Sequence, residues 1–204
     1  MTANSDLMSE AKKSLEGNWG IAIGTYLVYV ILVGALGAIP FVGTPISLVI
    51  GGPLALGMII FSKNIANDNE VRLEQVFDGF KQFGTSLATY LLAAVATVIG
   101  FMLLIIPGIL LSLGLAMSLY IISDDHEIGA HDALKKSYEM MKGYKLKLFG
   151  LGLMFFGLAL LCILTLGIGF FFLAPFTQVT MVKFYQDVKA DYEGTLPPAE
   201  PVLE

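Results

Sequence analysis

LFGLGLMFFGLALLCILTLGIGFFFLAPFTQVTMV, residues 148–182, contains no Asp, Glu, Lys or Arg. Two other charge-free stretches, residues 20–62 and 82–123, precede it. Each stretch is long enough for two helices, because about 20 apolar residues cross a hydrocarbon core roughly 30 Å thick. Each also holds an uncharged turn sequence, at Ile39-Pro40-Phe41-Val42-Gly43, Ile106-Pro107-Gly108 and Leu166-Gly167-Ile168-Gly169. We therefore expect an all-α, polytopic membrane protein of six transmembrane helices, arranged as three tandem helical hairpins.

The composition excludes a soluble globular domain. Hydrophobic residues make up 56% of the chain and charged residues only 14%, whereas soluble domains have about 25% charged residues. The mean hydropathy is +0.76. The net charge of -5 provides no excess of basic residues for binding phosphates, so we expect no nucleic-acid partner.

The charge distribution also predicts an orientation. If each stretch forms a hairpin, all 12 Lys and Arg residues lie on the same side of the membrane, which the positive-inside rule assigns to the cytoplasm. We expect a multi-pass protein of the cell (inner or plasma) membrane with both termini cytoplasmic. The N-terminal segment does not resemble a cleaved signal peptide, because Asp6 and Glu10 accompany Lys12 and Lys13.

A unit of about 60 to 65 residues recurs along the chain. Gly17, Gly79 and Gly143 are each followed within two positions by an aromatic residue, and each stands between a charged amphipathic segment and an apolar helix. This spacing favours three repeats at about residues 5–68, 69–125 and 126–190, which form a single membrane domain 1–190. Any six-helix protein with short turns would show a similar spacing. The end of the chain, 191–204, is expected to be a disordered acidic tail.

The charged segments have helical periodicity and are expected to lie flat on the cytoplasmic surface. In the first, Ser5 or Asp6 is the expected cap. The apolar faces are Leu7, Ala11, Leu15 and Trp19; Leu73, Val76, Phe77, Phe80 and Phe83; and Ala130, Ala133, Leu134, Tyr138 and Met141.

Basic and aromatic residues in these segments are candidates for contact with lipid headgroups. A lysine near an anionic leaflet contributes about 1 kcal/mol to membrane binding, and tryptophan favours the interface. The alternative is that they only determine the topology. The candidates are Lys12, Lys13, Trp19, Lys142, Lys145 and Lys147.

Glycine and proline interrupt the second helix of each predicted hairpin at a similar distance from its charged end. Interruptions at matching positions of a repeat indicate a ligand cavity, because proline leaves a backbone carbonyl without its helical partner. Ordinary packing kinks are the alternative. The cavity candidates are Pro53, Gly114, Pro175, Thr177 and Gln178.

The chain has no visible catalytic equipment. The charge-free stretches also lack histidine, so no acid, base or activated nucleophile lies at membrane depth. Cys162 is the only cysteine, and the acidic segment around His126 and His131 has no fixed ligand spacing. We expect no catalytic residue, no metal site and no cofactor. Residues 108–122 would form a helix of only about 22 Å, which is short for a full crossing.

Several motifs carry a resemblance to a known family. They are Ala133-Leu134-Lys135-Lys136-Ser137, Met141-Lys142-Gly143-Tyr144-Lys145, Thr165-Leu166-Gly167-Ile168-Gly169, Pro175-Phe176 and Phe184-Tyr185, with Gly52-Pro53-Leu54 and Phe77-Asp78-Gly79-Phe80-Lys81 earlier. In these the chain resembles a bacterial integral-membrane family catalogued as domain of unknown function 975, itself related to the membrane domain of glycerophosphodiester phosphodiesterases. Phe176 departs from the tyrosine that is usual in the family. The resemblance covers about residues 7 to 190 and implies a six-helix membrane protein without an established activity.

Three functional classes remain after these exclusions. We expect a non-catalytic integral membrane protein that binds membrane lipids, or a membrane or cytoplasmic partner protein, at the cytoplasmic leaflet. The alternative is a passive permease or carrier for a hydrophobic or lipid-derived solute. An intramembrane enzyme is the least favoured, because no reactive pair of residues is visible.

Overall fold

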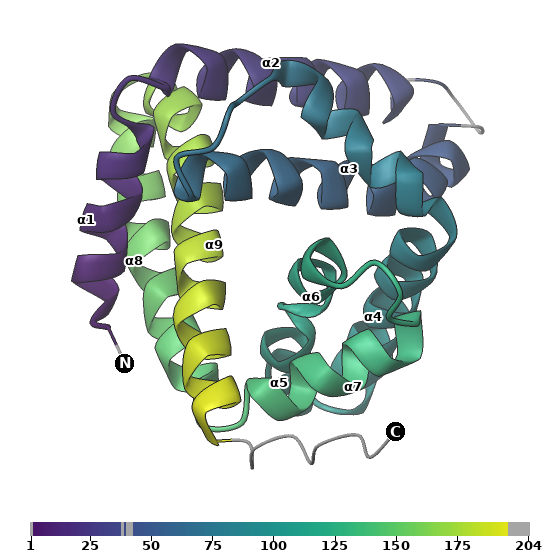
Figure 1. Ribbon diagram of the computed structural model, residues 1–204. Helices are drawn as coiled ribbons and strands as arrows, with labels where there is room; N and C mark the ends of the chain where they lie inside the picture. Colours follow the sequence, from purple (N-terminus) through teal and green to yellow (C-terminus); the bar gives the residue numbers. More distant parts are fainter. Residues whose placement is uncertain (1, 38, 40–42, 196–204) are drawn as a thin grey trace, which may run out of the picture.

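The computed structural model describes residues 2–37, 39 and 43–195, which contain helices and no strand (Figure 1). The predicted all-α class is therefore confirmed for this part of the chain. The helices are α1 (Asn4–Leu15), α2 (Trp19–Gly37), α3 (Gly43–Ala66), the 3₁₀ helix η1 (Leu73–Gln82), α4 (Phe83–Leu103), α5 (Ile105–Leu115), α6 (Ser118–Asp124), α7 (Ala130–Met140), α8 (Lys145–Leu164) and α9 (Gly169–Thr195).

Four helical segments in the described residues are long and apolar enough to cross a membrane. They are Pro45–Ala66, Leu73–Leu103, Ile105–Asp124 and Lys145–Leu164. A fifth is added if α1 and α2, which meet at an angle of 97°, count as one broken span. These helices are compatible with a membrane protein. Four or five segments of the described residues are long and apolar enough to span a membrane, whereas the sequence predicted six spans.

The helix pairs do not share one direction. In Figure 1, α2 and α3 run across the view, whereas α8 and α9 run down it and α1 lies beside α9. The sharp bend after α1 carries the chain from one direction into the other. The structure thus differs from a simple row of three parallel hairpins, and the hairpin arrangement is not confirmed.

The packing of η1 on α3 is a contact between two backbones. A Cβ atom on Gly57 would lie 1.7 Å from the carbonyl oxygen of Val76, and one on Gly79 would lie 2.0 Å from that of Pro53. No side chain fits at either position, because real Cβ contacts are never this short. Gly79 therefore serves close helix packing.

The apolar face predicted for this segment is divided between the core and the exposed surface. Val76 is buried, whereas Phe77, Phe80 and Phe83, predicted on the same apolar face, are 45%, 37% and 39% exposed. A 3₁₀ helix has three residues per turn, so side chains three positions apart are aligned. The three rings form a row, with centroids 6.4 Å and 6.3 Å apart. We call Phe77, Phe80 and Phe83 the aromatic row.

The predicted turn at Ile106-Pro107-Gly108 lies elsewhere. The break falls at Leu104, whose backbone is extended, and Pro107 lies in the first turn of α5, where a missing N–H costs nothing. Gly108 instead packs against α4, since a Cβ there would lie 2.8 Å from the backbone nitrogen of Phe101. The segment from Ile105 to Asp124 spans 20 residues, so the short crossing expected from residues 108–122 is corrected.

The turn predicted at Leu166-Gly167-Ile168-Gly169 is confirmed. It separates α8 from α9, and both Leu166 and Gly167 have positive φ. The first predicted turn, around Pro40, lies outside the described residues. Two boundaries also shift: α1 is capped by Ala3 rather than Ser5 or Asp6, and α9 continues past residue 190 to Thr195.

The core lies where α1, α3, α6 and α9 meet. Its largest fully buried side chains include Leu15, Phe61, Ile121 and Phe184. Asp124, at the end of α6, joins the same elements, because its carboxylate accepts hydrogen bonds from Tyr185 at 2.9 Å, from Lys189 at 2.5 Å and from Lys63. These bonds fix the charged ends of α3, α6 and α9 against one another.

Candidate functional site

A groove of about 400 Å³ lies between α7 and the α4–α5 pair, and we call it the α7 groove. It is lined by Ala96, Leu111, Leu115, His131, Leu134, Lys135, Tyr138, Glu139 and Lys142.

Ser137 fixes α7 over this groove. Its side chain is fully buried, and its hydroxyl donates to the carbonyl of Gly114 at 2.8 Å while accepting from the N–H of Met117 at 3.2 Å. These two backbone groups lie at the break between α5 and α6, where the helical hydrogen bonds are interrupted. One serine therefore satisfies the break and holds α7 against it.

Gly114 allows Tyr138 and Lys145 to approach α5. A Cβ at Gly114 would lie 2.6 Å from Cδ2 of Tyr138 and 3.2 Å from Cε of Lys145. The Lys145 ammonium lies 3.8 Å from the centre of the Tyr138 ring, within the range of a cation–π interaction. A lysine and an aromatic ring thus stand side by side at one edge of the groove.

The groove combines an apolar floor with a basic rim. Ala96, Leu111 and Leu115 come from the apolar faces of α4 and α5, while the exposed residues Lys135 and Lys142 come from the charged segment. Glu139 is the one carboxylate among the lining residues. This arrangement can hold an amphiphile, with a hydrocarbon chain on the floor and an anionic group at the lysines.

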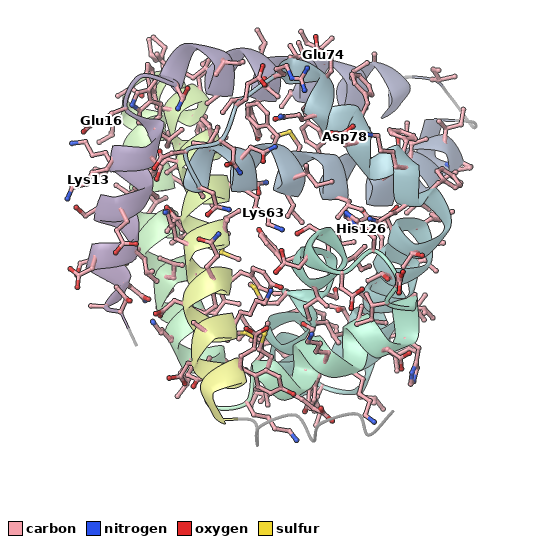
Figure 2. The ribbon with its side chains drawn as sticks, in the orientation of Figure 1. Lys13, Glu16, Lys63, Glu74, Asp78 and His126 are labelled. Carbon is pink, nitrogen blue, oxygen red and sulfur yellow. The ribbon has the colours of Figure 1, made fainter. Side chains whose placement is uncertain are left out.

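The structure brings together some of the predicted headgroup residues but not others. Lys142 lines the groove and Lys145 stands at its edge, whereas Lys147 forms an ion pair with Asp187 at 2.9 Å. Trp19 packs against Phe172 near the beginning of α9, with ring centroids 5.8 Å apart. Lys12 and Lys13 are exposed on α1, where Figure 2 shows Lys13 on the outer side of the molecule.

The predicted cavity residues lie in three separate places. Pro53 contacts η1 and Gly114 contacts α7. Thr177 and Gln178 line a pocket of about 440 Å³ with side chains of α2 and α8, and the nearby Pro175 is buried in α9. The structure does not place the five residues around one cavity.

Ser137, Tyr138 and His131 were not predicted as site residues. Tyr138 was assigned to the apolar face of the third charged segment, and Ser137 was noted only in a motif that carries the family resemblance. Tyr138 follows a signal that can be read from the sequence, since it shares a helical stripe with Leu134 and Met141. The sequence does not show that this stripe faces α4 and α5. Among the residues that the structure describes, no three His, Cys, Asp or Glu side chains gather so as to hold a metal ion.

Comparison with known proteins finds a family match for part of the chain. Residues 93–192 match the family described as "Protein of unknown function (DUF975)". The match confirms the predicted family over these residues, which include every residue of the α7 groove. No curated protein and no solved structure matches the chain significantly. The relation to the phosphodiesterase membrane domain stays a prediction.

Proposed function

We propose that this chain, identified over residues 93–192 as a member of the DUF975 family, is an integral membrane protein that binds anionic lipid in the α7 groove. The site binds its lipid without chemical turnover and lies at the cytoplasmic leaflet. One observation carries the proposal: a single groove joins apolar side chains of two candidate spans to lysines of the adjoining charged segment.

The groove matches the two parts of an anionic lipid. Leu111 and Leu115 provide a surface for an acyl chain, whose burial contributes about 0.8 kcal/mol per CH₂ group. Lys135 and Lys142 provide N–H donors and positive charge for a phosphate at the membrane surface. A zwitterionic lipid of the same chain length would lose most of the second contribution.

The proposal places all the charged segments at the cytoplasmic face of the cell membrane. The positive-inside rule supports this orientation, and the apolar segments supply the spans. Four of the proposed crossings are the segments that are long and apolar enough to span a membrane. The other two are α2 and the apolar first half of α9. Six crossings keep both termini in the cytoplasm, as the charge pattern predicts.

The test compares lipid binding by two double variants of the full chain. Purified protein in detergent is titrated with fluorescent phosphatidylglycerol and, separately, with phosphatidylcholine of the same chains. Lys135→Gln with Lys142→Gln removes two charges worth about 1 kcal/mol each, so phosphatidylglycerol should bind roughly 30-fold more weakly. Phosphatidylcholine binding should be weak and should change little.

Lys12→Gln with Lys13→Gln is the matched control, because it removes the same charge from exposed lysines outside the groove. It should leave the affinity for phosphatidylglycerol within about twofold of the unmodified protein, as expected for surface charges away from the site. An equal loss in both double variants would mean that the protein has only a diffuse attraction for anionic lipid, and the groove would have no special role.

A further inference from the structure

A second pocket, of about 460 Å³, lies between α3, η1 and the end of α6, and we call it the α3–η1 pocket. It shares no residue with the α7 groove. Figure 2 labels three of its residues, Lys63 on α3, Asp78 on η1 and His126 in the loop after α6. The lining residues are Ile60, Lys63, Asn64, Asp78, Lys81, Gln82, Ser123 and His126.

Both signs of charge face this pocket. Lys63 donates to the carbonyl of Ser123 at 3.1 Å and to Asp124, which leaves one of the three N–H groups of its ammonium for a ligand. Lys81 forms an ion pair with Asp78 at 2.7 Å, and its side chain is 77% exposed. Because each lysine has a carboxylate partner, the pocket has no large excess of either charge.

Gln82 carries a polar atom without a partner. Its Oε1 is buried and accepts no hydrogen bond from the described residues, while its Nε2 contacts Nδ1 of His126. Whichever way round the amide is assigned, one of its two ends lacks a protein partner. A buried polar group without a partner destabilises a protein, so a ligand that forms a hydrogen bond with this end of the amide would be stabilised.

These features define the chemistry of a ligand. An anionic group can accept hydrogen bonds from Lys63 and Lys81, and an N–H donor can bond to Gln82 Oε1 and to the carboxylate of Asp78. We propose that the α3–η1 pocket binds a phosphate ester of a primary amine, such as phosphoethanolamine, with the phosphate at the lysines and the ammonium at Asp78 and Gln82.

The same chemistry occurs free in solution and as the headgroup of phosphatidylethanolamine. Phe77 and Phe80 of the aromatic row directly precede Asp78 and Lys81 on η1, and Phe83, the first residue of α4, follows Gln82. A lipid held by its headgroup here would therefore have aromatic rings near its chains. Both sources satisfy the proposal, and the experiment below distinguishes them.

The experiment measures binding of two phosphate esters that differ at the nitrogen, where one has N–H donors and the other has methyl groups. Full-length protein in detergent is titrated by calorimetry with phosphoethanolamine and with phosphocholine, whose quaternary nitrogen has no N–H. In a second set of measurements, binding of the corresponding lipids is compared with phosphatidylethanolamine or phosphatidylcholine supplied in nanodiscs. Phosphoethanolamine or its lipid should bind about tenfold more tightly or better, because hydrogen bonds to charged groups are the strong ones.

Asp78→Asn and Glu74→Gln provide the matched variants, since both neutralise a carboxylate of η1 but only Asp78 lines the pocket. Asp78→Asn should weaken binding of the favoured probe about tenfold, and Glu74→Gln should leave it unchanged. Gln82→Met, which keeps the length of the side chain, should also weaken binding, and it replaces Asp78→Asn if that variant fails to fold.

Binding of the lipid alone identifies a headgroup site, and binding of the soluble probe identifies a small-molecule site; either supports the proposal. The proposal is overturned if neither probe binds, if phosphocholine binds as well as phosphoethanolamine, or if Asp78→Asn and Glu74→Gln behave alike. The Lys135→Gln, Lys142→Gln variant should retain this binding, so the two sites succeed or fail separately.

Discussion

Gly79 illustrates how a single residue can be marked by the sequence for a reason that only the structure reveals. The three glycines that mark the repeat were expected to be equivalent. Gly17 and Gly143 have φ of +86°, which favours glycine. Gly79 does not have a positive φ; glycine is needed there because a side chain would collide with the backbone of α3. A sequence shows where glycine recurs, but it does not separate a conformational need from a steric one.

Replacing Gly79 by alanine should break the contact between η1 and α3. The added Cβ would lie 2.0 Å from a backbone oxygen and 2.6 Å from a backbone nitrogen, and neither atom can move without shifting a helix. Overpacking usually costs 1–3 kcal/mol, so we expect a loss of about 3 kcal/mol in the free energy of unfolding. The thermal unfolding midpoint in detergent measures this loss.

Gly84→Ala is the control for that substitution, because a Cβ at Gly84 meets nothing within 4 Å. It should be neutral or raise the midpoint slightly, since alanine is the better helix former by about 1 kcal/mol. If Gly79→Ala unfolds at the same temperature as Gly84→Ala, the close approach of η1 and α3 is wrong.

At the scale of the element, periodicity alone did not identify the helix type of η1. The apolar residues from Leu73 to Phe83 recur at spacings of three and four, which agree with both 3.0 and 3.6 residues per turn over so short a segment. The prediction therefore placed Val76 and the aromatic row on one apolar face. The close packing of Gly57 on Val76 determines the face that is buried, and that contact lies outside the segment itself.

In α1, too, the sequence predicts the apolar face of the helix but not what that face packs against. The predicted stripe of α1 at Leu7, Ala11 and Leu15 does form one face, and that face is buried within the protein, because α1 is a regular helix with one contact face. The direction of that face was not predictable, since it depends on α9. The N-terminal end is held there by Asp187, whose carboxylate accepts hydrogen bonds from Thr2 and pairs with Lys147.

This attachment of the N-terminus should depend on pH. Burial opposes the charge of Asp187, but hydrogen bonds from Lys147 and Thr2 outweigh it and lower the pKa of this carboxyl below its ordinary value. A lowered pKa stabilises the attached state above the unfolded pKa of about 3.9. That stability is lost as the pH falls through the lower pKa of the folded protein.

A nitroxide label at Ala3, in a Cys162→Ser background, reports the attachment through its mobility. The label should be restrained at pH 7 and should become mobile as the pH falls below about 4. Asp187→Asn should already increase its mobility at pH 7, whereas Glu10→Gln, which alters an exposed carboxylate of α1, should not. Equal mobility in the two variants would remove Asp187 from this role.

At the scale of the whole molecule, the sequence predicted the all-α class, the positions of most apolar helices and the family of residues 93–192. These follow from local properties, namely apolar length and short motifs. The directions of the helix pairs and the location of the sites did not follow, because they depend on contacts between distant segments. The α7 groove combines residues from Ala96 to Lys142, and the α3–η1 pocket combines residues from Ile60 to His126.

The proposed lipid site at the cytoplasmic leaflet rests on one placement of the chain, in which the charged segments share one side of the membrane and the uncharged turns share the other. Single cysteines report this placement when they are introduced one at a time into a Cys162→Ser background. Leu104 and Leu166 mark two uncharged turns, and Asn67 and Glu127 mark the charged side; all four are exposed.

A membrane-impermeant maleimide applied to intact cells gives the most direct measurement. The account predicts that cysteines at positions 104 and 166 react at once, and that those at 67 and 127 react only after the membrane is permeabilised. Reaction of all four cysteines in intact cells, or of none before permeabilisation, would contradict the proposed arrangement and the lipid site that depends on it.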